Sequence, residues 1–487
     1  MDMSFSFLKD SLQNCALWFK GVRYNSFDHL NRMAFDRWCE TAKNVEVSID
    51  TRTVEKGQLF IAFKGQQVDG HLFLKEAIEK GALTLVIDAV HESSFTNLPK
   101  TLTQEVVCFM VENSLNALKQ LARAWRGKFT IPIVGITGSV GKTTTKEMVK
   151  AILETAGIVA CVNSGTLNSD IGLSLSLLRL NEEHKIGIFE VGINHKGEMA
   201  ELADILQPTL GLITNVAHVH VDGIGDLKSI AFEKRQLFKN FKEYDIGIIF
   251  GDHPLLAKEF YLHSVVKFGL QAKNQVRASK ISIVEDAEHC LITNFSLSIY
   301  KDTISVSLEG NHKVYVLNAL GAAAIATLLG ICLKDIAAGL SQFKTFKNRF
   351  QLKKISQDRG LMVADCYNAN PKSMCAALTT FHTMNQYPVK IAVLGDMLEL
   401  GKRSLFWHRQ IGRFFTKTLS IKKVILVGDF AQHMAKTLPP TIEIEVAGSW
   451  QEAQQKLEHL LGHTKALVLV KGSKGVGLAH MVQNLSV

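Results

Sequence analysis

The stretch that most constrains the fold is IPIVGITGSVGKTT, residues 131–144. Four of its first six residues are branched aliphatics, which predicts a strand covered on both faces. Residues 142–156 carry apolar side chains at helical spacing and Gly157 follows them, so we expect a helix whose amino end is Lys142. A buried strand, a glycine turn and a helix in this order indicate a phosphate-binding loop in an α/β protein.

The residues of the turn suit a nucleotide. Glycines at 138 and 141 let backbone N–H groups face a phosphate chain at the positive end of the helix. Lys142 would reach the terminal phosphates, and the Thr143 hydroxyl could ligate magnesium. Ile136 stands where the general pattern has glycine, so this is a variant loop, and a plain strand-to-helix connection is the alternative. We expect ATP or GTP as the ligand.

Composition excludes several classes of protein. The 487 residues allow about three domains, and 47% apolar with 21% charged residues is ordinary for a globular chain. The eight cysteines lack the paired spacing of zinc or redox sites. The net charge of +9 is spread thinly, which argues for anionic small substrates and against nucleic acid. We find neither a leader pattern nor an apolar run that could span a bilayer, and expect a cytoplasmic protein that acts as a monomer.

Two polar residues follow apolar strands downstream of the loop. Glu190 lies near the carboxyl end of the strand expected at 186–191, where a carboxylate is costly unless it faces a cation or a cleft. Ligands of parallel sheets bind at this edge, so Glu190 is a candidate metal ligand. His220 follows the strand expected at 210–215 and would lie at the same edge, although a lone loop histidine is more often a surface residue.

The flanking segments have different patterns. Up to about residue 110 we expect strands joined by polar turns, and the run Asp50-Thr51-Arg52 fits either a surface ion pair or a diphosphate site. Residues 276–310 predict short antiparallel strands at the edge of the central sheet. Beyond residue 343 the βα alternation restarts. Polar groups follow several strands there, which indicates a cleft more than simple turns; these strands are expected at 361–364, 391–394, 424–427 and 467–470.

Several of these runs resemble the Mur ligases of bacterial cell-wall synthesis, and the likeness covers almost the whole chain. The most specific run is Tyr-Asn-Ala-Asn-Pro at 367–371, which resembles the branch that joins D-alanyl-D-alanine to UDP-N-acetylmuramoyl-tripeptide. Supporting runs are Asp50-Thr51-Arg52, Glu190-Val191-Gly192, Gly395 to Gly401, and Lys471 to Lys474. The resemblance implies an α/β protein of three domains: a small α/β domain that binds the UDP-sugar (1–112), a central parallel-sheet ATPase (113–342) and a Rossmann-like domain that receives the dipeptide (343–487).

The resemblance also implies roles for single residues. The ATP phosphates would be held by Gly138, Ser139, Val140, Gly141, Lys142, Thr143 and Thr144, and the nucleotide also by Asn318 and Arg349. Magnesium, expected as two ions, would be bound by Thr143, Glu190, His220 and Lys234, the last carbamylated by carbon dioxide. Substrate contacts are implied for Thr51, Arg52, Asp69, Asn168, Asp365, Tyr367, Asn368, Asn370 and Ser373.

The implied chemistry is amide formation through an acyl phosphate. The peptide carboxylate takes the γ-phosphoryl group of ATP, which requires charge neutralisation by groups such as Lys142, His220 and magnesium, and the dipeptide amine then displaces phosphate. Two alternatives remain at this point. A folylpolyglutamate synthase-like ligase shares the ATPase plan, and a phosphate-loop NTPase switch would need an Asn-Lys-x-Asp motif, which this sequence lacks.

Overall fold

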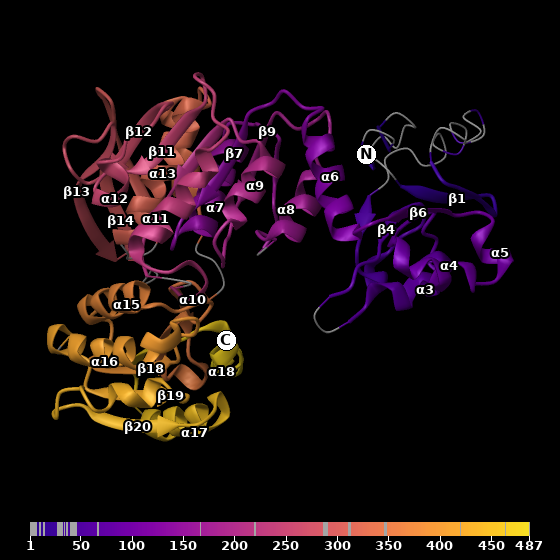
Figure 1. Cartoon of the computed structure of the whole chain (residues 1–487). Helices are drawn as coiled ribbons and strands as arrows, with labels where there is room; N and C mark the ends of the chain where they lie inside the picture. The colour runs from indigo at the N-terminus through magenta and orange to yellow at the C-terminus, as the bar shows by residue number, and fades with distance from the viewer. Residues whose placement is uncertain are drawn as a thin grey trace.

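The architecture is taken from a computed structural model, which describes residues 7, 8, 11, 12, 15–26, 33, 35, 38, 46–65, 68–165, 167–218, 221–285, 291–309, 313–344, 348–418, 420–462 and 464–486. It contains three β-sheets, each with helices packed on it. Figure 1 shows the three sheets as separate bodies, with the central one between the other two. This arrangement confirms the expectation of a three-part α/β protein.

The N-terminal sheet has the order β2-β1-β6-β5-β4-β3, in which β3 to β6 run parallel and β1 pairs antiparallel with β2 and β6. Its strands are β1 Ala16–Phe19, β2 Val22–Tyr24, β3 Val47–Ser48, β4 Leu59–Ile61, β5 Thr84–Asp88 and β6 Val107–Val111. The expectation of strands joined by polar turns was incomplete, because short helices lie between them: α3 Leu74–Glu79, α4 Glu92–Thr96 and α5 Lys100–Thr103. Each has only four to six residues, too few for helical periodicity to show.

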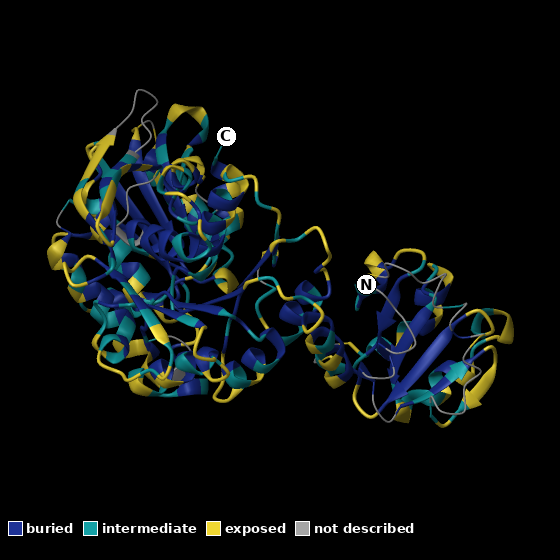
Figure 2. Cartoon of the chain, turned by 90° about the horizontal axis from the view of Figure 1, so that it is seen from above, coloured by how far each residue is buried: buried dark blue, intermediate teal, exposed yellow. Residues whose placement is uncertain are grey.

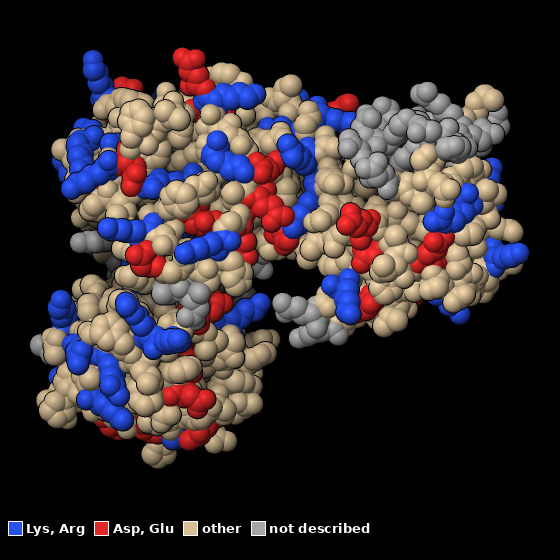
Figure 3. Space-filling view, in the orientation of Figure 1, with Lys and Arg blue, Asp and Glu red and all other residues tan. Residues whose placement is uncertain are grey.

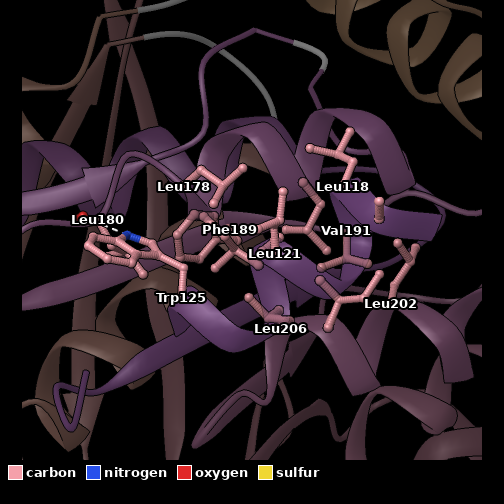
Figure 4. Close-up of a cluster of buried hydrophobic side chains, with 14 of the residues drawn as sticks. Leu118, Leu121, Trp125, Leu178, Leu180, Phe189, Val191, Leu202 and Leu206 are labelled. Atoms are coloured by element: carbon pink, nitrogen blue, oxygen red, sulfur yellow. Dashed lines mark hydrogen bonds between the residues drawn. The ribbon is translucent and has the colours of Figure 1, made fainter. Parts of the chain in front are cut away.

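One helix, α6 (Ser114–Arg126), connects this sheet to the central one, and Asn113 caps its first turn. Its apolar face packs against the first turns of the central part, and the Trp125 indole donates a hydrogen bond to the Leu180 carbonyl. Figure 4 shows Leu118 and Leu121 of α6 in one cluster with Phe189 and Val191, while the Trp125 indole lies beside Leu180. The core of the N-terminal part therefore continues without a break into the central part.

The central sheet has nine strands in the order β15-β14-β13-β12-β11-β10-β7-β9-β8. The strands are β7 Ile133–Thr137, β8 Ala160–Val162, β9 Ile186–Glu190, β10 Leu210–Ile213, β11 Ile246–Phe250, β12 Ser264–Gly269, β13 Val276–Glu285, β14 Leu291–Ile299 and β15 Asp302–Glu309. Strands β7 to β12 pair in parallel, and β13 to β15 form the antiparallel edge that the sequence predicted.

Helices cover both faces of the central sheet, so β7 is buried throughout. Val134 and Ile136 face α7, α13 and α14, while Ile133 faces the layer that includes α8, α9 and α11. The helices are α7 Lys142–Thr155, α8 Asp170–Leu177, α9 Glu198–Leu206, α10 Val221–Ile224, α11 Leu227–Arg235, α12 Pro254–Ala257, α13 Lys313–Leu328 and α14 Leu333–Gln342. Figure 2 shows the strands as a buried layer beneath more exposed helices and loops.

The C-terminal sheet has the order β16-β17-β21-β18-β19-β20 and is parallel except for β16. Its strands are β16 Gln351–Lys354, β17 Gly360–Asp365, β18 Val389–Gly395, β19 Lys423–Val427, β20 Glu443–Ala447 and β21 Ala466–Lys471. Its helices are α15 Pro371–Thr383, α16 Ser404–Phe414, α17 Trp450–Leu461 and α18 Leu478–Leu485. The four strands predicted here are confirmed.

No helix among the described residues combines the length and apolar character needed to cross a bilayer.

Candidate functional site

The predicted phosphate loop lies between β7 and α7, and its two glycines are required by their surroundings. Gly138 and Gly141 have φ of 149° and 90°, which disfavours any residue with a side chain. A Cβ at Gly138 would collide with the Thr214 hydroxyl, and one at Gly141 with the Asn318 side chain. The loop is thus shaped by close neighbours, and its glycines bring Asn318 of α13 against the amino end of α7.

The loop is also tied down by Asn215, which follows β10. Its carbonyl oxygen atoms, from the main chain and the side chain, accept hydrogen bonds from the N–H groups of Ser139 and Val140. The Thr214 hydroxyl donates to the Val140 carbonyl at 2.6 Å. These partners hold the turn in place without a ligand, which is the preorganisation that phosphate binding needs. The roles of Thr214 and Asn215 could not be predicted from the sequence, because only the parallel pairing of β7 with β10 brings them to the loop.

Lys142 begins α7, and its ammonium donates a 3.0 Å hydrogen bond back to the Gly138 carbonyl. Its side chain is half-buried. Burial lowers the pKa of Lys142, Arg349 lowers it further, and the charge of Glu190 partly opposes both. The Lys142 ammonium therefore lies near both the positive charge of Arg349 and the negative charge of Glu190, where the phosphates of a nucleotide would bind.

Glu190, at the end of β9, is bonded to the loop. The Thr143 hydroxyl donates a 2.6 Å hydrogen bond to one carboxylate oxygen, and the Asn168 side-chain amide donates a 2.7 Å bond to the other. Glu190 as a whole is only 2% exposed. The structure therefore brings together three of the residues that the sequence singled out, and their oxygen atoms are the kind that magnesium prefers.

A second residue, Asn163, sets the position of Glu190 and was missed as a functional residue. Its side chain accepts a hydrogen bond from the Glu190 N–H at 2.9 Å and donates to the Glu190 carbonyl at 3.0 Å. It also donates to the Leu167 carbonyl, next to Asn168. The fully buried Lys146 of α7 donates to the Asn163 carbonyl at 2.5 Å. An asparagine in a loop carries no sequence signal for such a role.

Arg349 reaches the same place from the start of the C-terminal part. Its guanidinium donates a 3.1 Å hydrogen bond to the Thr143 hydroxyl and stacks over the Tyr367 ring, with 4.1 Å to the ring centroid. The Tyr315 hydroxyl of α13 donates to the Arg349 carbonyl at 2.6 Å. Arg349 therefore connects the phosphate loop to the Tyr-Asn-Ala-Asn-Pro loop. This position is consistent with the predicted contact between Arg349 and the nucleotide.

That loop follows β17 and is held by the neighbouring strand β21. Lys471 forms a buried 2.7 Å ion pair with Asp365 and also donates to the Asn368 carbonyl. Burial raises the pKa of Asp365, and the Lys471 ammonium offsets part of that rise. The Ser473 hydroxyl donates to the Ala369 carbonyl at 3.4 Å. The runs at 365–371 and 471–474, which the sequence flagged separately, therefore form one structure.

Asn370 and Ser373 bond to each other at the start of α15. The Asn370 side chain accepts from the Ser373 N–H at 2.9 Å, and the Ser373 hydroxyl accepts from the Asn370 N–H at 3.0 Å. This reciprocal capping box satisfies two N–H groups of the first helical turn. The Asn370 side-chain oxygen therefore caps the helix, while its side-chain N–H groups take no part in the capping box.

One cavity of about 610 Å³ lies between the central and C-terminal parts. Its walls contain the phosphate loop, the end of β9 and the loop after β17. Of the predicted site residues, the cavity brings together Ser139, Val140, Gly141, Lys142, Thr143, Thr144, Asn168, Glu190, Asn318, Arg349, Asp365, Tyr367, Asn368, Asn370 and Ser373. A nucleotide site and an acceptor site thus share one space.

Two further residues were predicted as metal ligands, His220 and Lys234. His220 lies outside the described residues. Lys234 of α11 is buried, at 2% exposure, and no described group is hydrogen-bonded to its amine. Burial lowers its pKa well below the usual value, and the charge of Lys142 lowers it further. Lys234 is therefore close enough to the phosphate loop for the charge of Lys142 to affect its pKa, although Lys234 does not line the cavity.

The predicted substrate residues of the N-terminal part lie in that part and do not line the cavity. Thr51 is buried in the turn after β3, and Arg52 is exposed and paired with Asp50 at 2.6 Å. Asp69 accepts hydrogen bonds from the N–H and the ring of His71. His91 stacks on His71 nearby, and these three side chains could approach a metal. Both nitrogens of the His71 ring already have partners, which argues for a hydrogen-bonded cluster.

Charge on the surface is mixed. Figure 3 shows lysine and arginine side chains scattered over all three parts of the face in view, and acidic side chains gathered over α8 and α9. Asp170 and Glu201, from these two helices, both pair with Lys119 of α6, at 3.0 and 2.7 Å. On this face the positive charge is not concentrated in a single stripe.

Comparison with known proteins agrees with this geometry. Three family models match successive stretches: "Mur ligase family, catalytic domain" at 45–126, "Mur ligase middle domain" at 136–326 and "Mur ligase, glutamate ligase domain" at 348–474. The chain is 32% identical over 442 residues to UDP-N-acetylmuramoyl-tripeptide–D-alanyl-D-alanine ligase of Bacillus subtilis (strain 168), covering 90% of this chain and 92% of that protein.

Solved structures give the same result. MurF from Acinetobacter baumannii has a TM-score of 0.81 at 26% identity, covering 99% of this chain and 98% of that one. MurF ligase from Thermotoga maritima, in complex with ADP, has a TM-score of 0.76 at 25% identity, covering 91% and 97%. The likeness extends through all three parts of the chain, including both walls of the cavity. The chain therefore belongs to the Mur ligase family.

Proposed function

We propose that this chain is an ATP-dependent ligase that joins D-alanyl-D-alanine to the peptide carboxylate of UDP-N-acetylmuramoyl-tripeptide. The observation that carries the proposal is the shared cavity, whose walls hold both the phosphate loop and the Tyr-Asn-Ala-Asn-Pro loop. In this scheme residues 1–112 hold the UDP-sugar through Thr51, Arg52 and Asp69, residues 113–342 bind ATP, and residues 343–487 receive the dipeptide. The names of the relatives support this choice of substrates.

The residues present fit a magnesium ion. The Thr143 hydroxyl and the Glu190 carboxylate are hard oxygen ligands that lie 2.6 Å apart beside the phosphate loop. Bound magnesium would neutralise charge on the transferring phosphoryl group. His220 and Lys234 complete the proposed set of ligands for two ions, His220 by resemblance alone.

The chain's own residues supply the rest of phosphoryl transfer. The peptide carboxylate attacks the γ-phosphorus, the bond to the β-phosphate oxygen breaks, and ADP and an acyl phosphate result. Lys142 and the N–H groups at the start of α7 stabilise the negative charge that develops on the phosphoryl oxygens. Asn318, packed against Gly141, positions the nucleotide side of the loop. No side chain needs to form a covalent bond in this step.

The second step forms the amide. The neutral amine of the dipeptide attacks the acyl carbon, the bond from that carbon to the phosphate oxygen breaks, and inorganic phosphate leaves while the amine loses a proton. Asp365, Tyr367 and Asn368 would position the dipeptide, because they line the C-terminal wall that faces the phosphate loop. A cavity closed by both parts also keeps water from the acyl phosphate.

We also infer that Lys234 is carbamylated. The lone pair of a neutral amine attacks the carbon of carbon dioxide, a proton is released, and the product is an anionic carbamate. Burial with no described hydrogen-bond partner favours the neutral amine that this reaction needs. A carbamate would place a negative charge near the Lys142 ammonium, where a protonated Lys234 would place a positive one.

The proposed function is tested by product formation. Purified protein is incubated with ATP, UDP-N-acetylmuramoyl-tripeptide and D-alanyl-D-alanine, and both released phosphate and the mass of the product are measured. We expect ADP, phosphate and UDP-N-acetylmuramoyl-pentapeptide in equal amounts, only when all three substrates are present. N-acetylated dipeptide is the matched control, because its blocked amine cannot attack. Turnover of folate with glutamate, and none with the dipeptide, would overturn the proposal.

A further inference from the structure

The cations that line the cavity differ in what they already bind. Four lysine and arginine side chains lie in its walls: Lys142, Arg349, Lys372 and Lys471. Lys142 is bonded to the Gly138 carbonyl, Arg349 to Thr143 and the Tyr367 ring, and Lys471 to Asp365. Three of the four are therefore engaged with groups of the protein.

Lys372 has no such partner. No described residue forms a hydrogen bond, an ion pair or a ring contact with its ammonium. Lys372 is exposed at the cavity wall, and desolvation there lowers its pKa, with no described carboxylate opposing that shift. Across the interface, its charge lowers the pKa of His253, whose imidazole is already disfavoured as a cation by burial. Within the described part of the chain, the positive charge of Lys372 in the cavity wall therefore has no counter-ion.

The position of Lys372 argues against a role in stability. It is the second residue of α15, a helix of 13 residues, where the positive end of the helix disfavours a cation. The neighbouring Asn370 and Ser373 cap the helix with their own side chains, so Lys372 contributes no cap. A lysine that is unfavourable for its helix and unpaired in a cavity suits an anionic ligand.

We propose that Lys372 binds the terminal carboxylate of the incoming dipeptide, an assignment that rests on the proposed function. The dipeptide must present a neutral amine to the acyl phosphate, so its only full charge at that stage is the carboxylate at the other end. In the proposed function the cations near the phosphate loop hold phosphate oxygens, whereas Lys372 lies on the C-terminal wall with Asn370. The positive end of α15 adds to the attraction for an anion.

A substrate and residue cycle tests the assignment. Michaelis constants are measured for D-alanyl-D-alanine and for its C-terminal amide, in wild type, Lys372→Ala and Lys372→Arg. We expect wild type to prefer the acid over the amide by about 10- to 100-fold, the range of a charge-assisted hydrogen bond. Lys372→Ala should lose that preference, Lys372→Arg should keep most of it, and the Michaelis constant for ATP should stay within about twofold.

Two controls make the outcome specific. Lys436→Ala removes an exposed lysine of the same part that does not line the cavity, so it should retain the preference for the acid. The melting temperature of Lys372→Ala should equal or exceed that of wild type, because the helix loses an unfavourable charge. An undiminished preference for the acid in a folded Lys372→Ala would overturn the assignment. Wild type that forms no amide would instead overturn the proposed function.

Discussion

The hydroxyl of Thr143 donates a 2.6 Å hydrogen bond to the Glu190 carboxylate and accepts one of 3.1 Å from Arg349. A single oxygen atom therefore connects the phosphate-loop helix, the end of β9 and the start of the C-terminal part. Asn163 is hydrogen-bonded to the main chain of Glu190, and Asn168 donates to the second oxygen of the Glu190 carboxylate. A cation placed here would meet two fixed oxygen donors, which is the basis of the first prediction.

Glu190→Gln should raise the magnesium concentration needed for half-maximal activity by at least about tenfold, because an amide oxygen lacks the full charge of a carboxylate. The Asn163 bonds to the Glu190 backbone survive this change, so the strand should stay in place. The check is the rate of phosphate release as a function of magnesium at saturating ATP. An unaltered magnesium dependence would remove Glu190 from the proposed metal site.

Thr143→Ser should be nearly silent in the same assay, whereas Thr143→Val should behave like the Glu190 variant. Serine keeps the hydroxyl that contacts Glu190 and Arg349, and valine has the shape of threonine without it. The comparison separates the oxygen atom from the space that the side chain fills. Equal losses in both variants would point to packing.

Lys142→Ala should lower kcat by about a hundredfold or more, since it removes a charge aimed at the transferring phosphoryl group. The side chain is half-buried and, among the described residues, its hydrogen-bond partner is the Gly138 carbonyl, so the fold should persist. Circular dichroism and the melting temperature verify the fold, and single-turnover phosphate release measures the step. Lys150→Ala, on the solvent side of the same helix, is the control. It should keep both the melting temperature and the phosphate release of wild type. Activity of Lys142→Ala within a few-fold of wild type would contradict the phosphate-loop assignment.

The parts of the fold with strong periodicity could be predicted from the sequence. The strand before Gly138 and the helix after it appear as β7 and α7, with limits within about two residues. Strand β20 was missed, because its residues alternate acidic and apolar side chains at a sheet edge and only one of the five is buried. The helices α3 to α5 were missed because each is barely longer than one turn.

The site shows a similar division. Residues at strand ends, such as Glu190 and Asp365, could be predicted because parallel strands bring their carboxyl ends to one edge. Asn163 and Asn215 could not, because their roles depend on contacts with backbone groups that are 27 and 75 residues away. Lys372 directly follows the Tyr-Asn-Ala-Asn-Pro run, but it is distinguished only by having no bonding partner among the described residues, and a sequence does not show partners.

Lys234 carbamylation predicts a dependence on bicarbonate. Protein prepared in carbon dioxide-free buffer should lose activity at lower pH, because protonation of the carbamate nitrogen releases carbon dioxide, and added bicarbonate should restore it as pH rises. A carbamate signal in ¹³C NMR with labelled bicarbonate measures the modification apart from activity. Lys234→Ala should lack that signal, and short carboxylic acids should rescue part of its turnover. Wild type without the signal would contradict the inference.

Asn370→Ala should show two separable effects. Its oxygen caps α15, so the variant should lose about 1 kcal/mol of stability. Its side-chain N–H groups take no part in the capping box, so loss of a dipeptide contact should also raise the Michaelis constant for D-alanyl-D-alanine more than that for ATP. Ser373→Ala is the partial control, since it weakens the same capping box. If Ser373→Ala raises the dipeptide constant equally, the cap rather than the amide positions the substrate.

The last prediction concerns closure of the cavity and rests on a contact between the central and C-terminal parts, formed by two residues that do not line the cavity. The ring of His218, in the loop after β10, lies 5.3 Å from that of Trp407 on α16. His218 is two residues before His220, so the C-terminal part touches the loop that carries a proposed metal ligand. An aromatic pair of this kind contributes about 0.5–1.5 kcal/mol.

Trp407→Ala should therefore reduce kcat/KM by about two- to tenfold, and Trp407→Phe should recover most of it. Binding of an ATP analogue with UDP-tripeptide should change the tryptophan fluorescence of wild type, and that change should be lost in Trp407→Phe. Trp450 gives a matched control, because it packs on His480 at 5.4 Å within the C-terminal part alone. Trp450→Phe should keep both the fluorescence change and the rate. A change that follows Trp450 instead of Trp407 would place the closing motion away from the His218 loop.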